Sequence, residues 1–229
     1  MGIRKVMDIN DIAGHSKGGT TLLRPLQDRY VTKLIDVVPS FIETNHLTLL
    51  SIAFSFFVVL GAYLSRYDIL WVLLVIAANI GQYLSDFLDG SIGRKRNTGL
   101  IFWGFFVDHY LDFFFASSNI IAFSLVLSLS QYFAMWMLIL VAANFLIELH
   151  KCNMFGKYNV NGSNLIGGIE LRFITVILFT LTMVIYDHMN LVMAIVVIIE
   201  TIQIVVEFYK FQKELWELDM ENKRRQIRK

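Results

Sequence analysis

The stretch LTLLSIAFSFFVVLGAYLS, residues 47–65, contains no charged side chain. A helix of roughly 20 apolar residues is long enough to cross the ~30 Å hydrocarbon core of a bilayer. A helix lying in water would need a polar face that recurs every 3.6 residues, and this stretch has no such face. We therefore predict that residues 47–65 form a transmembrane helix.

The rest of the chain repeats this character. Of its 229 residues, 56% are hydrophobic and 17% are charged, whereas roughly 25% are charged in soluble domains. The third apolar run is interrupted by Asp108, His109 and Asp112. The sequence predicts an all-α fold, a six-transmembrane-helix bundle whose further spans are Ile69–Asp89, Leu100–Ser128, Gln131–Leu149, Gly167–Asp187 and Asn190–Phe211.

The segments outside residues 47–211 differ in composition from the six-helix domain that these spans define. Residues 1–21 are polar and contain glycine, which predicts a mobile segment. Residues 22–38 alternate apolar and charged residues at helical spacing. We interpret them as an amphipathic helix in the membrane interface, with an ordinary soluble helix as the alternative. Residues 212–229 carry both charge signs and predict a charged tail, which from Glu214 onward we interpret as a solvated helical extension.

Lysine and arginine are distributed unequally between the two sides of the predicted membrane. Eighteen of the 20 lie before the first helix, in the loops after the second and fourth helices, or from Lys210 onward. Six helices place all these segments on one side, and the other side has only Arg66. Because the basic side faces the cytoplasm, we predict a multi-pass integral membrane protein with both termini cytoplasmic. The net charge of +1 gives no indication of a nucleic-acid partner.

Four aspartates lie in DFLDGSIGRKRNTGLIFWGFFVDHYLD, residues 86–112. Asp86 and Asp89 are three residues apart, and Asp108 and Asp112 are four apart, so each pair shares one helix face. Both pairs lie toward the cytoplasmic helix ends, with Asp108 about 12 Å into the third helix. Carboxylates at such depth are costly and tend to be functional, paired or metal-bound. The sequence predicts a site below the headgroup surface that opens to the cytoplasm.

Two such faces turned together would concentrate up to four negative charges. Divalent cations that prefer oxygen ligands, Mg²⁺, Mn²⁺ or Ca²⁺, would relieve the repulsion. Two of them could grip a pyrophosphate and stabilise charge on the attacking and leaving oxygens. Gly90 and Gly93 let the backbone approach a ligand, and Arg94 offers a donor fork for phosphate. In the alternative, the acids pair with Arg94, Lys95 and Arg96, or they line a cation pathway.

The spacing of these residues resembles the signature of the CDP-alcohol phosphotransferase (CDP-alcohol phosphatidyltransferase) family. The eight matching positions are Asp86, Asp89, Gly90, Gly93, Arg94, Gly104, Asp108 and Asp112. Gly93 replaces the usual alanine, and the spacing from Arg94 to Gly104 is one residue longer than is usual in the family. The segment Thr44–Thr48 is similar to the family's Pro-Asn-x-x-Thr motif, with Thr44 at the proline position and Asn45 at the asparagine position.

The resemblance implies a phospholipid-synthesis enzyme that transfers a substituted phosphate group from a CDP-linked donor to an alcohol acceptor and releases CMP. Asp86, Asp89 and Asp108 would bind the metals. Asp112 would contribute to that binding and deprotonate the acceptor hydroxyl. The implied CDP pocket is lined by Asn45, Gly90, Gly93, Arg94 and Gly104. By analogy with the family, a homodimer is also expected.

Two subclasses of the family differ in donor and acceptor. One transfers from CDP-diacylglycerol to a soluble alcohol such as glycerol phosphate, inositol phosphate or serine. The other transfers from a CDP-amino-alcohol to diacylglycerol. The pair Asp108-His109 is similar to the choline and ethanolamine enzymes, whereas glycerol-phosphate enzymes usually have Asp-Pro there and Asp-Lys at the fourth acid, which here is Asp112-Phe113. His109 could equally pack beside the site.

Other charges within the spans leave alternatives open. Arg172, near Glu170 at the start of the fifth span, could bind an acceptor phosphate or a lipid headgroup. It could instead form a salt bridge with Glu170 or Glu148, or extend to the interface. Glu200 and Glu207 could pair across a subunit interface. The rival functions are a cation transporter and a non-catalytic family member, although the presence of all four acids argues against the latter.

Overall fold

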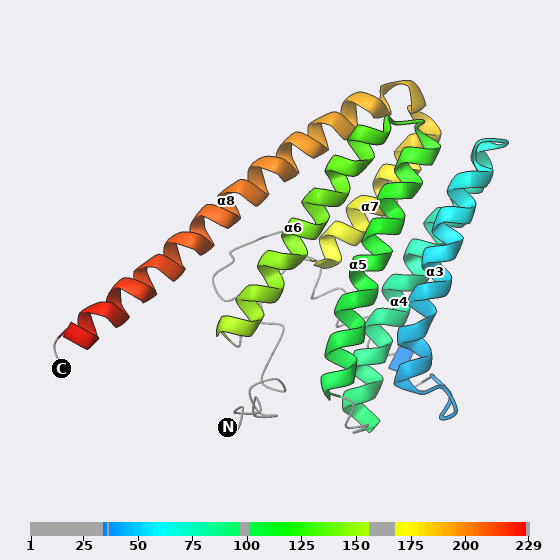
Figure 1. The fold of residues 1–229 in the computed structure, drawn as a ribbon. Coiled ribbons are helices and arrows are strands. Elements are labelled where there is room, and N and C mark those ends of the chain that lie inside the picture. Colours follow the sequence, from blue (N-terminus) through cyan, green and yellow to red (C-terminus); the bar gives the residue numbers. More distant parts are fainter. Residues whose placement is uncertain (1–33, 36, 97–100, 156–167, 228–229) are drawn as a thin grey trace.

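The computed structural model describes residues 34–35, 37–96, 101–155 and 168–227. These residues contain helices and no strand, which confirms the all-α class within them (Figure 1). Residues 1–21 and most of the predicted amphipathic helix at 22–38 lie outside this description. The elements are α3 (Thr44–Leu64), the 3₁₀ helix η2 (Ile69–Trp71), α4 (Val72–Arg96), α5 (Ile101–Val126), α6 (Gln131–Phe155), α7 (Gly168–Val184) and α8 (Tyr186–Ile227).

Five segments are long and apolar enough to cross a membrane. They belong to α3, η2 with α4, α5, α6 and α8. The remaining helix, α7, is apolar but has only 17 residues, which corresponds to about 26 Å of helix. That length is shorter than the ~30 Å hydrocarbon core. The chain is thus a membrane protein with several apolar helices, and the count of six spans stays a prediction.

One helix ends well beyond its predicted position. α4 continues to Arg96, so that Gly90, Gly93 and the predicted loop of basic residues belong to its last turns. α8 continues through residues 212–227, which agrees with the helical extension predicted for the charged tail. Apolar composition predicted only the part of α4 that suits a membrane. The hydrogen-bond ladder of a helix can continue into polar sequence that contains no proline.

Successive helices alternate in direction (Figure 1). α3 packs against both α4 and α5, α4 also contacts α7, and α6 lies between α5 and α8. Toward its C-terminal end α8 diverges from the other helices. The carboxyl end of α4 and the amino ends of α5 and α7 therefore lie at the same end of the bundle.

The apolar core lies toward the opposite end of the bundle, where α3 ends and α4 begins. It includes Val58 and Val75, which are fully buried. The rings of Phe123 and Phe179 stack there with centroids 3.9 Å apart. Close contact between α3 and α4 requires a small residue at Gly61, because a Cβ atom there would lie 3.0 Å from the Val75 side chain and 3.1 Å from a backbone oxygen.

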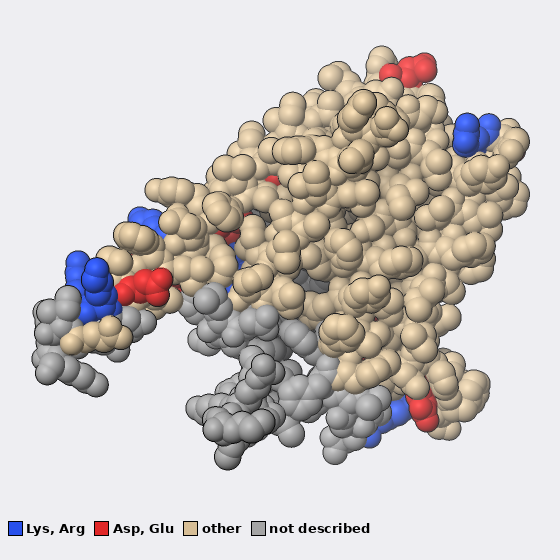
Figure 2. All heavy atoms as spheres, in the orientation of Figure 1, with Lys and Arg blue, Asp and Glu red and all other residues tan. Residues whose placement is uncertain are grey.

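The outer surface is apolar over the middle of the molecule. Figure 2 shows most charged side chains near the ends of the helices, with uncharged residues covering the area between them. On α8, the side chains of Ile195, Ile198 and Ile202 are about half exposed or more. An apolar surface of this extent suits lipid contact rather than water.

Candidate active site

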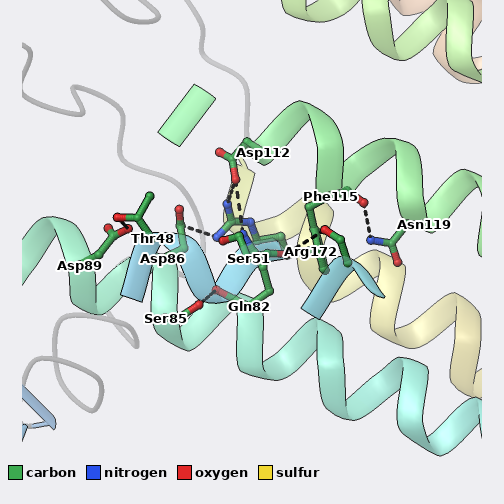
Figure 3. A network of polar contacts seen from close by, with 11 residues as sticks. Thr48, Ser51, Gln82, Ser85, Asp86, Asp89, Asp112, Phe115, Asn119 and Arg172 are labelled. Atoms are coloured by element: carbon green, nitrogen blue, oxygen red, sulfur yellow. Dashed lines mark hydrogen bonds and ion pairs between the residues drawn. The ribbon is translucent and has the colours of Figure 1, made fainter. Parts of the chain in front are cut away.

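The carboxylates gather where α4 ends and α5 and α7 begin (Figure 3). One carboxylate oxygen from each of Asp86, Asp108 and Asp112 lies within 4.8 Å of the other two. All three residues are partly buried, and the side chain of Asp112 is 32% exposed. The predicted pairing of a face of α4 with a face of α5 is therefore present in the described residues.

Asp89, the fourth predicted acid, has a different environment. It is 7% exposed and does not belong to the group of three carboxylates. The Thr48 hydroxyl, from the first turns of α3, donates to Asp89 Oδ2 at 2.7 Å. Thr48 stands at the threonine of the predicted Pro-Asn-x-x-Thr-like motif, so this motif and the aspartate signature meet here in space.

Arg172 of α7 binds two of the three clustered carboxylates. Its guanidinium donates to Asp86 Oδ2 at 2.5 Å and to Asp112 Oδ1 at 2.9 Å. The salt bridge with Glu148 that sequence reasoning considered is not formed, since Glu148 lies 3.8 Å from Lys151 instead. The side chain of Glu170 lies outside the described part. Arg172 thus places a positive charge between carboxylates of two other helices.

Two acids on α8, Glu200 and Glu207, lie away from this cluster. Glu207 forms a 2.9 Å ion pair with Lys151, which joins α8 to α6 within one chain. Glu207 thus has a cationic partner within its own chain, and its pairing across a subunit interface stays a hypothesis. Glu200 is partly buried on α8, and nothing in the described residues explains it.

Two buried amides continue the polar face of α4 away from the carboxylates. Gln82 is 1% exposed, and its Nε2 lies 3.4 Å from Asp112 Oδ1. Asn79 is 5% exposed and donates to Asn119 Oδ1 of α5 at 2.9 Å. Sequence reasoning missed both residues, although Gln82 and Asn79 precede Asp86 by four and seven residues, spacings that keep them on its face.

The residues predicted to line a CDP pocket have varied positions. A Cβ atom added at Gly104 would meet none of the described residues within 4 Å, so space lies beside this glycine among them. Gly90 and Gly93 are partly buried in the last turns of α4, and the side chain of Arg94 lies outside the described part. Asn45 Oδ1 accepts a hydrogen bond from the backbone N–H of the next residue at the start of α3.

The flanking residues of the signature also have defined places. His109 is partly buried and does not belong to the carboxylate group. Arg96 binds backbone oxygens rather than an acid in the described part of the chain. Its guanidinium donates to the backbone oxygens of Val38, Pro39, Ser40 and Ile42. This contact attaches the segment before α3 to the end of α4.

The cluster has the chemistry of a divalent-metal site. Its ligand atoms are all carboxylate oxygens, which Mg²⁺ and Mn²⁺ prefer. A cationic group, Arg172, already lies between two of them, so positive charge is accommodated at this position. Three oxygens within 4.8 Å of one another need only a small contraction to share one ion. The residues present therefore fit a metal.

Comparison with known proteins bears on the same region. No curated protein matches this chain. Residues 41–206 match the model of the CDP-alcohol phosphatidyltransferase family, and this match includes α3 to α7, most of the apolar part of α8 and all four aspartates. Since the match covers more than two thirds of the sequence, the chain belongs to the CDP-alcohol phosphatidyltransferase family.

Proposed function

We propose that this protein is a divalent-metal-dependent enzyme of phospholipid synthesis that transfers a substituted phosphate group from a CDP-linked donor to an alcohol. The observation that carries the proposal is the convergence of Asp86, Asp108 and Asp112 within 4.8 Å, inside the segment that matches the family. Family membership supports transfer from a CDP-alcohol. The geometry supports the assignment of these acids to the reaction centre.

The proposed reaction uses Asp112 as the general base. Its carboxylate takes the proton of the acceptor hydroxyl, and the resulting oxygen forms a bond to the β-phosphorus of the donor. The bond between that phosphorus and the bridging oxygen breaks, and CMP leaves with the bridging oxygen. Asp86, Asp89 and Asp108 would hold Mg²⁺ or Mn²⁺, two ions in the full site, which would neutralise charge on the diphosphate.

Arg172 has one proposed role before a metal binds and another after it has bound. Without a metal, its guanidinium balances the charge of Asp86 and Asp112. Metal binding to these carboxylates would release it to bind the phosphate of a lipid headgroup, or that of the acceptor if the acceptor is a phosphate-bearing soluble alcohol, because its planar fork suits phosphate oxygens. Glu170 and His109 stay candidates for acceptor contacts.

The CDP moiety would lie near the end of α4 and the start of α5. Space beside Gly104 supports this location, because a larger residue would project toward the ligand there. Gly90 and Gly93 would allow a close approach to the α4 backbone, and Arg94 would bind phosphate. Asn45, at the first turn of α3, would line the side of the pocket that α4 and α5 leave open.

We favour a CDP-amino-alcohol donor with diacylglycerol as the acceptor. The sequence Asp108-His109, followed by Asp112-Phe113, supports this choice. The alternative within the family is CDP-diacylglycerol with glycerol phosphate, inositol phosphate or serine. A donor-by-acceptor screen with mass spectrometry of the lipid product distinguishes the two, because each pair yields a different phospholipid.

The active site and both termini would face the cytoplasm. The supporting observation is the sequence asymmetry of eighteen basic residues against Arg66. A protease-sensitive tag at the C-terminus should be protected in intact cells and cleaved after lysis. Cleavage in intact cells would contradict this orientation.

The function itself is tested with purified protein, labelled CDP-choline or CDP-diacylglycerol, and the candidate acceptors. CMP release should require Mg²⁺ or Mn²⁺, and Asp112→Asn should lower the rate about 10²–10⁴-fold, because it removes the general base. Asp187→Asn is the matched control, an exposed acid in the first turn of α8 far from the cluster, and it should retain the wild-type rate. Ion flux across vesicles without CMP release would favour the transporter instead.

A further inference from the structure

Gln82 reaches from α4 toward the proposed general base on α5. It lies one helical turn from Asp86, on the side of the apolar core, and is 1% exposed. Its Nε2 donates to Asp112 Oδ1 across a distance of 3.4 Å, which is long for an N–H···O bond (Figure 3). Arg172 donates to the same oxygen at 2.9 Å.

The other end of this amide is buried without a partner. Gln82 Oε1 has no hydrogen-bond partner among the described residues. An unpaired buried carbonyl oxygen destabilises a fold. A glutamine present only for packing would be less favourable here than an apolar side chain of the same shape, so the burial of Gln82 needs another explanation.

Asn79, which lies about two helical turns before Asp86 on α4, is another buried amide with which Gln82 can be compared. Its Nδ2 donates to Val75 O and to Asn119 Oδ1, both at 2.9 Å. Asn119 in turn donates to the backbone oxygen of Phe115 at 3.1 Å. This bridge between α4 and α5 has good geometry at both ends, as expected for a structural contact.

We propose that Gln82 is a positioning residue for Asp112, an inference that rests on the proposed function. Its neutral amide holds one carboxylate oxygen of Asp112 in the orientation that meets the acceptor hydroxyl. A neutral donor suits this role because it adds no charge that would compete with metal ions for the carboxylates. Its Oε1 then accepts a hydrogen bond from a donor that arrives with the bound acceptor or with water.

The experiment compares Gln82→Met with Asn79→Leu in purified, full-length protein. Rates of CMP release are measured with whichever pair, CDP-choline with diacylglycerol or CDP-diacylglycerol with glycerol phosphate, supports wild-type turnover. Hydrogen bonds to charged groups correspond to a change of about 10- to 100-fold, so Gln82→Met should lower kcat by that factor. The KM values of both substrates and the Mn²⁺ affinity should change by no more than about twofold.

Thermal melting distinguishes the two roles. Gln82→Met should melt at or above the wild-type temperature, because it removes an unpaired buried oxygen. Asn79→Leu should melt lower, because it leaves Asn119 without its partner, and it should keep kcat within about twofold. Gln82→Leu is assayed in parallel and carries the same expectation if the methionine variant does not fold.

Three outcomes would overturn the proposal. The first is a wild-type kcat in Gln82→Met or Gln82→Leu. The second is an equal loss of kcat in Asn79→Leu, which would assign the effect to helix spacing. The third is a rise in KM alone, which would make Gln82 a binding residue. A wild-type chain that releases no CMP from either donor would overturn the proposed function and this inference with it, so the two failures are distinguishable.

Discussion

At one end of the bundle α5 and α7 pack the stacked rings of Phe123 and Phe179, and at the other end the same helices contribute Asp112 and Arg172. The aromatic end contains the main cluster of buried apolar side chains. The carboxylate end buries charges and amides that are costly in a membrane. The difference indicates that the apolar end holds the helices together and lets the other end keep groups that do not favour stability.

The largest expected effect comes from removing a clustered carboxylate. Asp108→Asn should lower CMP release on the order of 10³-fold, because metal ions supply several kcal/mol of transition-state stabilisation. The melting temperature should stay the same or rise, since a repelling negative charge is removed. Rates and melting curves of the same preparation check this. A large loss of stability would mean that the carboxylate end also holds the fold.

The apolar end should respond in the opposite way. Phe179 is fully buried, and Phe179→Ala should lower the free energy of unfolding by about 3–5 kcal/mol. The rate of CMP release per folded molecule should not change at low temperature. Equilibrium unfolding in detergent micelles measures the first quantity.

Ile177→Ala is the matched control on α7, because Ile177 is 54% exposed and leaves little cavity. It should change the free energy of unfolding by about 0.5 kcal/mol or less. If Phe179→Ala and Ile177→Ala were equally destabilising, the buried aromatic stack would not be the main source of stability at the apolar end of the bundle.

Sequence patterns predicted the helices well where the membrane dictates composition. All but the last residue of 47–65, and all of 131–149, lie within helices because apolar runs of that length are strongly constrained. The end of α4 was missed because a helix can continue where hydrophobicity stops. Its last turn is also held by Arg96, which binds backbone oxygens 54 to 58 residues away along the chain, and no local pattern contains such a contact.

The candidate site was predictable to a similar degree. The spacing of the aspartates placed each pair on one face, and three of the four acids gather. The partner of Arg172 was not predictable, because Asp86 is 86 residues away and nearer acids were available by sequence. Gln82 could have been found from its spacing to Asp86, but an amide gives a weaker signal than a charge in an apolar helix.

A smaller effect is expected from Arg172, because its guanidinium competes with a metal ion for the carboxylates. Arg172→Gln should raise Mn²⁺ affinity about tenfold, equivalent to about 1.4 kcal/mol, because a positive charge beside the carboxylates is removed. Electron paramagnetic resonance of free Mn²⁺ measures the affinity. Arg66→Gln, an exposed arginine beyond the end of α3, is the control and should leave it unchanged. Unchanged or weaker binding in Arg172→Gln would mean that Arg172 supports the metal site.

The smallest effect should come from an ion pair that belongs neither to the apolar end nor to the carboxylate end of the bundle. Lys151 and Glu207 are about one fifth to one quarter exposed, and exposed ion pairs contribute about 1 kcal/mol or less. Glu207→Gln should therefore lower the free energy of unfolding by no more than that and leave CMP release unchanged. Lys213→Gln, which removes a 3.9 Å pair on the exposed part of α8, should give no measurable change. If Glu207→Gln instead abolished activity, the reaction centre would extend from α4, α5 and α7 to the contact between α6 and α8, and the division of the bundle into a structural end and a reactive end would be too simple.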